Sequence, residues 1–291
     1  MSIPEISFDD YSPSEMEKRV ESASISKTKL GFLSLFMLAF LAGSFIALGA
    51  EFYTIVTFDS ELSYGLTKLI GGLAFSLGLI LVIVAGAELF TGNNLIMMGL
   101  ASRVVTFRQM LKNWGISYIG NFIGSISVVI LMYFTNLWKI EGYLLGASAV
   151  IIANDKINLT FLEALSRGML CNILVCLAVW LCFSARTVVS KILAIIFPIT
   201  AFVASGFEHS IANMYFIPMG ILLKNNSAIT SKVFEISPNI DLERLNTLGF
   251  LGNLLPVTLG NIIGGALMVA VVYWLIIVLP KRLNKRKIIK N

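Results

Sequence analysis

The sequence has little charge: Asp, Glu, Lys and Arg together make up 13% of the 291 residues, whereas hydrophobic residues make up 57%. A soluble domain is usually about half apolar and about a quarter charged, so this composition excludes an ordinary soluble globular protein. Histidine occurs once and cysteine three times. With so few metal-ligating side chains and no glycine-rich phosphate loop, we expect no metal site, no cofactor and no enzymatic activity.

Long apolar runs take the place of the missing charge. Six of them can each span, or nearly span, a hydrocarbon core of about 30 Å. They are residues 30–53, 66–87, 116–134, 161–183, 188–204 and 248–279. We expect an all-α membrane protein with a six-helix transmembrane domain at 30–280. A cytoplasmic N-terminal segment (1–29) would precede it, with no signal peptide, and a basic cytoplasmic tail (281–291) would follow.

Lysine and arginine are distributed unevenly between the two ends of these runs. With the N-terminus in the cytoplasm, most of them fall in cytoplasmic segments and few in external ones. The positive-inside rule therefore places both termini in the cytoplasm. The basic tail fits a topogenic role or a contact with lipid headgroups, and no nucleic acid is needed to explain it.

The N-terminal segment contains its own helix signal. Ser12 and Glu15 have the spacing of a capping box, and Pro13 occupies the first helical position. This pattern predicts a short helix over residues 13–24 on the cytoplasmic side.

Two apolar segments, 67–101 and 188–223, are too long for one span, because an unbroken helix of either length would be roughly 50 Å long. Each contains a polar, glycine-containing interruption, at 86–94 and 205–214. Non-helical backbone at membrane depth is tolerated only where it is buried in protein or lines a watery cavity. We therefore expect the second and fifth transmembrane helices to be broken.

The two interruptions share a spacing of acid and amide side chains. Each has a glutamate five residues before an asparagine: Glu88 and Asn93 in the first, Glu208 and Asn213 in the second. The carboxylates can accept hydrogen bonds from backbone N–H groups freed at the break, and the amides can serve donors and acceptors. We interpret all four as helix-break support. The alternative is a direct contact of a glutamate with substrate or its proton.

A second repeated motif follows each interruption. G-N-F-I-G-S begins at Gly120 and G-N-I-I-G-G at Gly260, and we interpret both as small-residue surfaces for close helix packing. Spans one to three therefore repeat as spans four to six, in an inverted 3+3 arrangement. Such repeats place a site at mid-membrane, where the broken helices meet.

The single histidine lies in the second interruption. His209 directly follows Glu208, while the first interruption has Thr91 in the matching region. A buried, hydrogen-bonded histidine with a structural role is one interpretation. However, ionisable residues in a membrane interior are functional candidates by default, and imidazole exchanges a proton near neutral pH, which favours a role in permeation.

The stretches A-G-A-E-L-F-T-G-N-N (85–94) and A-S-G-F-E-H-S-I-A-N-M-Y-F-I-P-M-G (204–220) resemble the formate/nitrite transporter family. The resemblance covers residues 30–280. It implies an aquaporin-like fold, a homopentamer with one pore in each protomer, and a multi-pass protein in the inner (plasma) membrane of a prokaryote. Its partners would then be other copies of itself, the lipid bilayer and small anions such as formate.

The resemblance also implies roles for individual residues. Thr91 and His209 should face each other at the pore centre, with Asn172 near them and Lys156 in the outer vestibule. The residues that match the cytoplasmic-side constriction are Phe75, Leu79 and Phe202, and those that match the outer one are Leu89, Phe90 and Val175. The family's N-terminal helices are associated with gating, and the alternative for residues 13–24 is an interfacial anchor.

The function implied is a channel or transporter for small monovalent weak-acid anions, with formate as the leading substrate. Apolar rings block water and hydrated ions, and a bare anion at mid-bilayer costs several kcal/mol, so a weak acid would cross protonated near the histidine, after attraction by Lys156. Alternatives are nitrite or hydrosulfide transport by the same fold, and a neutral-solute pore of the aquaporin type. The paired Asn-Pro-Ala boxes of that second class are absent.

Overall fold

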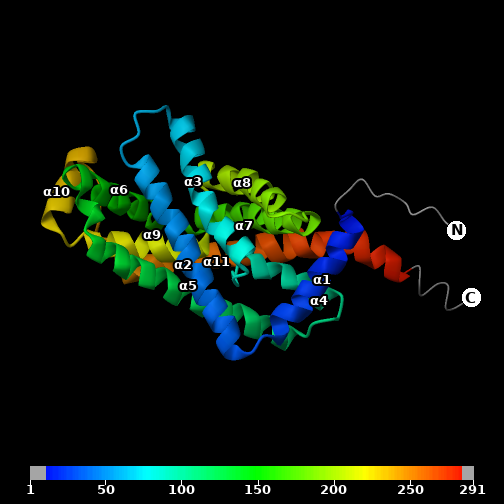
Figure 1. The fold of residues 1–291 in the computed structure, drawn as a ribbon. Helices are drawn as coiled ribbons and strands as arrows, with labels where there is room; N and C mark the ends of the chain where they lie inside the picture. The colour runs from blue at the N-terminus through cyan, green and yellow to red at the C-terminus, as the bar shows by residue number, and fades with distance from the viewer. Residues whose placement is uncertain (1–10, 284–291) are drawn as a thin grey trace, which may run out of the picture.

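The computed structural model describes residues 11–283, and within this range the chain is helical, without a β-strand. The elements follow one another in the order shown in Figure 1. They are α1 (Pro13–Lys29), α2 (Phe32–Thr57), α3 (Tyr64–Ala85), η1 (Gly92–Leu95), α4 (Ile96–Ala101), α5 (Phe107–Thr135), η2 (Leu137–Lys139), α6 (Ile140–Ile157), α7 (Phe161–Ser184), α8 (Val188–Ala204), α9 (Ser210–Leu223), α10 (Ser227–Ile236), α11 (Thr247–Ile262), η3 (Ile263–Val271) and η4 (Trp274–Val278).

Within residues 11–283, five helices are long and apolar enough to cross a membrane. They are α2, α3, α5, α7 and the continuous helix Thr247–Leu283, which contains α11, η3 and η4. α8 and α9 are shorter apolar helices. Large apolar side chains such as Phe134 and Phe197 are exposed on the outside of the molecule. An apolar surface of this extent is stable in lipid and not in water, so the chain is a multi-pass membrane protein.

The chain leaves helical geometry at two matching places. α3 ends at Ala85 and α8 ends at Ala204, and a glycine in the left-handed region follows closely on each. Gly86 has φ 81° and Gly206 has φ 68°, a conformation that glycine adopts without steric cost. The backbone then runs without helix to η1 in the first case and to α9 in the second.

The N-terminal helix α1 begins at Pro13, with the capping box between Ser12 and Glu15 in place. It continues to Lys29, beyond the expected end at residue 24. The hydroxyls of Ser24 and Thr28 each donate to a carbonyl one turn back in the helix, so this hydroxyl-rich stretch remains helical. α1 packs beside α4 and lies at the opposite end of the molecule from α6 and α10 (Figure 1).

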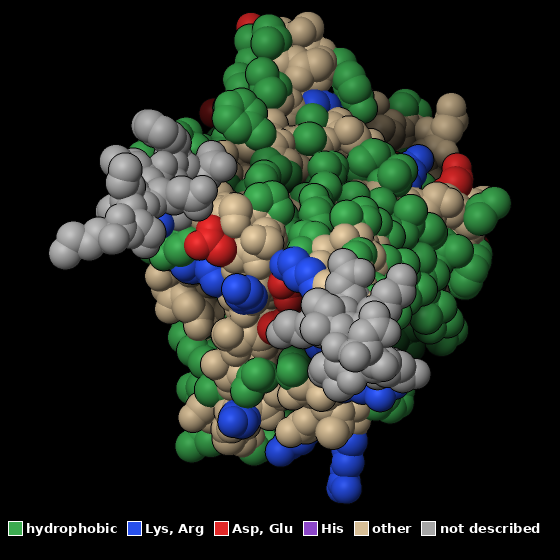
Figure 2. All heavy atoms as spheres, turned by 90° about the vertical axis from the view of Figure 1, so that its right-hand side faces the viewer, with side chains coloured by type: hydrophobic (Ala, Val, Ile, Leu, Met, Phe, Trp, Pro, Cys, Tyr) green, Lys and Arg blue, Asp and Glu red, His purple; other side chains and the backbone are tan. Residues whose placement is uncertain are grey.

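The end of the molecule at which both termini lie is charged. Figure 2 shows basic and acidic side chains gathered on this end, with apolar side chains around them. Here α1 contacts the last helix, because Glu17 lies 3.7 Å from Lys281 and Glu21 lies 3.9 Å from Arg282. Burial, followed by the neighbouring Glu21 carboxylate, raises the pKa of Glu17.

The two glycine–asparagine motifs lie where helices approach closely. A Cβ atom added at Gly124 would overlap the carbonyl of Phe40 in α2, and one added at Gly264 would overlap the carbonyl of Met169 in α7. Only glycine permits these distances. The glycines therefore behave as the small-residue packing interpretation expects.

Candidate functional site

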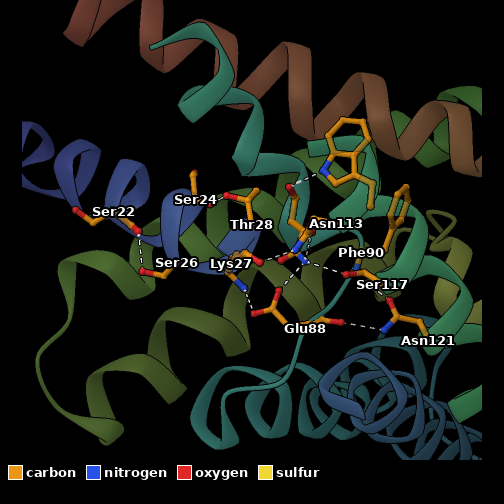
Figure 3. Close-up of polar contacts among 12 residues, drawn as sticks. Ser22, Ser24, Ser26, Lys27, Thr28, Glu88, Phe90, Asn113, Ser117 and Asn121 are labelled. Carbon is orange, nitrogen blue, oxygen red and sulfur yellow. Dashed lines mark hydrogen bonds and ion pairs between the residues drawn. The ribbon is translucent and has the colours of Figure 1, made fainter. Parts of the chain in front are cut away.

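The carboxylate of Glu88 lies in a buried polar cluster at the first interruption (Figure 3). It accepts from Lys27 Nζ at 2.7 Å and from Asn93 Nδ2 at 2.8 Å. The Asn93 amide also donates to Asn113 Oδ1 at 2.9 Å, and the Asn113 amide donates to the carbonyl of Lys27 at 3.2 Å. The cluster therefore ties α1 and α5 to the interrupted segment.

The second interruption carries the same cluster, built from other residues. Glu208 accepts from Lys156 Nζ at 2.8 Å and from Asn213 Nδ2 at 2.6 Å. Asn213 also donates to Asn253 Oδ1 at 2.8 Å, and Asn253 donates to the carbonyl of Lys156 at 2.8 Å. Here α6 and α11 occupy the places that α1 and α5 have in the first cluster.

These clusters correct the expected partners of the two glutamates. The carboxylates of Glu88 and Glu208 bond lysine and asparagine side chains, rather than the backbone N–H groups that the sequence suggested. An ammonium group satisfies a buried carboxylate more fully than a neutral N–H does, because a charge-assisted hydrogen bond is roughly twice as strong. The amides of Asn93 and Asn213 donate to these carboxylates, so their role as helix-break support stays a prediction.

Backbone groups at the interruptions are served by two other asparagines. Asn121 accepts from the N–H of Phe90 at 2.9 Å and donates to the carbonyl of Glu88 at 3.0 Å. Asn261 accepts from the N–H of Ser210 at 2.9 Å and donates to the carbonyl of Glu208 at 3.0 Å. Both belong to the glycine–asparagine motifs, so these motifs combine close packing with backbone support.

Thr91 of the first interruption and His209 of the second contact each other, with Oγ1 and Nε2 2.9 Å apart. The other ring nitrogen, Nδ1, accepts from the N–H of Ala212 at 3.1 Å and caps the start of α9. An acceptor Nδ1 carries no proton, so the ring's N–H is at Nε2 and points to Thr91. Both side chains are almost completely buried.

His209 also lines a cavity of about 270 Å³, which we call the Lys156 cavity. Its wall includes Phe75 and Phe202, whose rings pack edge to face with centroids 5.6 Å apart. The ring of Phe202 lies 6.0 Å from that of His209. The charged residues of the wall are Lys68, Asp155, Lys156, Arg167 and Glu208.

A second cavity, of about 90 Å³, lies beside α1, and we call it the Lys27 cavity. Besides Lys27, its wall includes Leu79, Val82, Leu89 and Gly92. Gly92 adjoins Thr91, so the contact between Thr91 and His209 lies between the two cavities. The Lys27 cavity is the smaller and the more apolar of the two.

The positions of the two cavities correct the expected constrictions. Phe75 and Phe202 were expected on the side opposite Lys156, but they line the same cavity as this lysine. Leu79 and Leu89, which were assigned to different constrictions, line the Lys27 cavity together. The reason is the direction of α3, which begins near the Lys156 cavity at Tyr64 and ends near the Lys27 cavity.

The remaining expected pore residues are buried in the same region. Asn172 donates to the carbonyl of Thr91 at 3.3 Å and to the carbonyl of Asn261 at 2.7 Å, and Val175 is buried. Phe90 is directed elsewhere, since its ring packs edge to face against Tyr118 on α5 at 4.9 Å. Its side chain is not part of the wall of either cavity.

Several residues of the site were not recognised from the sequence. They are Lys27, Asn113, Asn121, Arg167, Asn253 and Asn261. The signal for two of them was present, because the asparagine is repeated in both glycine–asparagine motifs. Within residues 11–283, no group of three or more His, Cys, Asp or Glu side chains is arranged to hold a metal ion.

Comparisons with known proteins agree with this architecture. The sequence model described as "Formate/nitrite transporter" matches residues 14–275. The formate channel FocA of Escherichia coli (strain K12) is 41% identical over 271 residues, covering 92% of this chain and 95% of that one. A probable formate transporter of Methanothermobacter thermautotrophicus is 38% identical, covering 90% and 96%.

A solved structure with a similar fold is a pentameric formate channel with formate bound. It is 44% identical, with a TM-score of 0.76, and the match covers 84% of this chain and 97% of that one. An FNT family ion channel that is 26% identical matches with the same TM-score. These relatives are channels and transporters rather than enzymes.

Proposed function

The chain belongs to the formate/nitrite transporter family, and we propose that it is a channel or transporter for small monovalent weak-acid anions, with formate as its substrate. The observation that carries the proposal is the buried contact between Thr91 and His209, at 2.9 Å between two cavities. Formate is the anion named for the similar channels. Nitrite and hydrosulfide are the alternative substrates within the same family.

The proposed architecture is a six-span inverted repeat with an aquaporin-like fold. The two matching interruptions support it, since each has a left-handed glycine at or near its start, Gly86 in the first and Gly206 in the second. The two equivalent clusters around Glu88 and Glu208 support it as well. Broken helices at mid-membrane are where transporters of this type hold their sites. We further propose a homopentamer, as in the similar pentameric formate channel.

The proposed orientation places the Lys156 cavity outside and the Lys27 cavity inside. The end that carries α1 and both termini would then be cytoplasmic, in the plasma membrane of a prokaryote, in line with the charge distribution. The basic tail beyond residue 283 lies outside the described residues. α1 covers the inner end of the pathway through the pair of Lys27 and Glu88, which suits a gate as well as an anchor.

The pathway has a barrier on each side of the Thr91–His209 contact. In the Lys156 cavity the barrier is the ring pair of Phe75 and Phe202, and in the Lys27 cavity it includes Leu79 and Leu89. Such apolar walls exclude hydrated ions. A bare anion between them would cost several kcal/mol, whereas the neutral acid would not.

We place the protonation of the anion beside His209. Because Nδ1 caps α9, the ring carries its proton on Nε2 and donates it to Thr91 Oγ1. The Thr91 hydroxyl hydrogen is then free to point at a substrate oxygen. A second proton on the ring would break the cap, so the transferred proton enters through the Lys156 cavity from the bulk solvent, as a hydronium ion that is left as water. Thr91 and His209 orient the anion that receives this proton.

Uptake into liposomes that contain the purified protein tests this proposal. Formate, nitrite, hydrosulfide, lactate and glycerol would be supplied separately, with internal pH recorded during each uptake. Uptake of formate accompanied by acidification of the lumen is the expected result. Uptake of glycerol without uptake of any acid would show a neutral-solute pore instead.

A further inference from the structure

The positive charges of the Lys156 cavity are not equally available to an anion. Lys156 Nζ lies 2.8 Å from Glu208 Oε1 and 5.2 Å from the ring centre of Phe216. Its charge is therefore balanced by a carboxylate that is only 4% exposed. A lysine held in this way keeps the second interruption in place, and little of its field is left for the cavity.

The ammonium group of Lys68 also has partners within the protein. Its ammonium group lies 3.2 Å from the hydroxyl of Tyr53 and 5.5 Å from the ring centre of Tyr64. The carboxylate of Asp155 lies in the same wall, and its pKa is raised by burial, against the opposing effect of Lys156 and then Lys68. Lys68 therefore shares the cavity with a group of opposite charge.

Arg167 is the cation of this wall whose charged group is not bound. Within residues 11–283, its guanidinium forms no hydrogen bond or ion pair, although the residue lines the cavity. Glu163, one turn earlier in α7, interacts electrostatically with Arg167, but its carboxylate accepts hydrogen bonds from the hydroxyl and N–H of Thr160 at the start of the helix. The carbonyl of Arg167 accepts from the N–H of Glu208 at 3.3 Å, which fixes the position of its backbone beside the second interruption.

A guanidinium group differs from an ammonium group in what it selects. Its planar N–H fork pairs with the two oxygens of a carboxylate through two parallel hydrogen bonds, whereas lysine acts as a point charge. Formate and nitrite each present two oxygen acceptors, whereas hydrosulfide presents only its sulfur as an acceptor. An arginine in the cavity wall whose guanidinium forms no hydrogen bond to the described part of the chain therefore favours anions with two oxygens.

We infer that Arg167 is the anion-docking and specificity-determining residue of the Lys156 cavity, and that it selects carboxylates and other two-oxygen anions. The inference rests on the proposed function and adds a residue to it. Lys156 then has a different part from the one its charge suggests: it holds Glu208, while Arg167 receives the anion before the ring pair of Phe75 and Phe202.

Uptake kinetics in liposomes test the inference, with Arg167→Gln and Arg167→Lys compared with the wild type. Initial rates would be measured against concentration for formate, nitrite and hydrosulfide, at low and at high ionic strength. Arg167→Gln should raise the KM for formate about tenfold, and high salt should reduce this difference. Arg167→Lys should return hydrosulfide uptake to the wild-type KM and leave the KM for formate and nitrite raised.

Arg244→Gln is the matched control. Arg244 is an arginine from the chain segment between α10 and α11, bonded to Asn158, and it does not line the Lys156 cavity. Its replacement removes the same charge and should leave the three KM values unchanged. Assembly of each variant would be checked by size-exclusion chromatography.

Two results would overturn the inference. One is a wild-type KM for formate in Arg167→Gln, and the other is an equal rise in Arg244→Gln. An Arg167→Lys variant that matched the wild type for all three anions would limit Arg167 to attraction and remove its role in selection. If the wild-type protein took up none of these acids, the proposed function itself would fail, irrespective of the variants.

Discussion

The two interruptions have the same supporting cluster, but they differ in the residue that follows the glutamate. Glu88 with Lys27 and Glu208 with Lys156 form clusters of the same composition, at 2.7 Å and 2.8 Å. Yet the residue after the first glutamate is Leu89, and the residue after the second is His209. Leu89 lines the Lys27 cavity and His209 lines the Lys156 cavity. The repeated residues bond the backbone and one another, and we propose that the residues that are not repeated carry the chemistry.

The cavities differ in the same way. The Lys156 cavity is larger, at about 270 Å³ against about 90 Å³, and it contains Arg167 and Asp155 besides its lysine. Four residues before each left-handed glycine, this cavity has Phe202 and the other has Val82. Selection and protonation of the anion are therefore expected on the Lys156 side.

The largest expected effect is the loss of one acid from a cluster. Glu208→Ala leaves Lys156, whose side chain is only 16% exposed, without its counter-charge. Breaking a buried pair in this way costs about 3–5 kcal/mol, so we expect a much lower melting temperature and loss of assembly. Glu88→Ala should cost less, about 1–3 kcal/mol, because Lys27 is 29% exposed and reaches water.

Thermal unfolding of the detergent-solubilised variants measures both costs. Glu208→Gln would serve as a control that keeps the hydrogen bond from Asn213 and loses the charge together with the acceptor for Lys156. If Glu208→Ala were as stable and as well assembled as the wild type, with altered substrate choice, the carboxylate would act on the substrate. The equivalence of the two clusters would then hold for geometry alone.

The second-largest effect is expected at His209, the position where the two interruptions differ. His209→Asn keeps a side chain that can cap α9, but it is too short to maintain the contact with Thr91 that orients the anion for protonation. Because a misplaced reacting group can cost about 100-fold in rate, we expect proton-coupled formate uptake to fall by about this factor, while passive export of the anion persists. Thr91→Val, which removes the other half of the contact, should have the same effect.

The test is internal pH recorded together with labelled formate uptake, at external pH values from about 5 to 8. His209→Asn with wild-type signals throughout this range would show that the histidine only caps its helix.

Much of this comparison could be predicted from the sequence, because it depends on short motifs. The start of α1 at Pro13 follows from its capping box, and the repeated spacing of glutamate and asparagine locates both interruptions. The end of α1 could not be predicted, since it depends on hydroxyls such as that of Ser24 bonding back along the helix. The sequence around a serine does not show whether its hydroxyl will bond a backbone carbonyl one turn back in the helix.

Hydrogen bonds between residues far apart in the chain could not be predicted from the sequence. Lys27 bonds Glu88 across 61 positions and Asn121 serves the first interruption across 31, and no local pattern encodes such distances. The position of Phe75 relative to Lys156 was predictable and was missed: α3 begins beside the Lys156 cavity, so it reaches Phe75 before Leu79. The Thr91–His209 contact was expected from the family resemblance and not from spacing.

A smaller effect is expected from the unequal apolar walls. Phe202→Ala opens the ring pair with Phe75, which packs at 5.6 Å, and water should then enter. We expect ionic leak to rise several-fold, with assembly intact. Val82→Ala is the matched control in the Lys27 cavity, and it removes less volume. Conductance in planar bilayers measures both variants, and an unchanged leak in Phe202→Ala and in Phe75→Ala would show that the ring pair is packing rather than a barrier.

The smallest effect comes from the residue before each lysine, which is Ser26 in the first repeat and Asp155 in the second. Burial raises the pKa of Asp155, and Lys156 opposes this shift. A raised pKa means that the carboxyl takes up its proton at a less acidic pH than usual. As external pH falls through this value, the Lys156 cavity loses a negative charge and attracts anions more strongly.

Replacing Asp155 with Asn removes this negative charge at every pH. We therefore expect the KM for formate at neutral pH to fall about twofold at low ionic strength, since a partly exposed charge contributes only about 0.4 kcal/mol. The fall in KM between neutral and acidic pH should become shallower by the same factor, and salt should reduce the difference. Formate uptake measured against concentration at both pH values checks this, with Ser26→Asn as the control at the corresponding place.

Because the proton-coupled step near His209 is unchanged in Asp155→Asn, the maximal rate should keep its own pH dependence. A variant that changed the maximal rate and left KM unchanged would place Asp155 in proton delivery, and the Lys156 cavity would then differ from the Lys27 cavity by a proton donor rather than by its field.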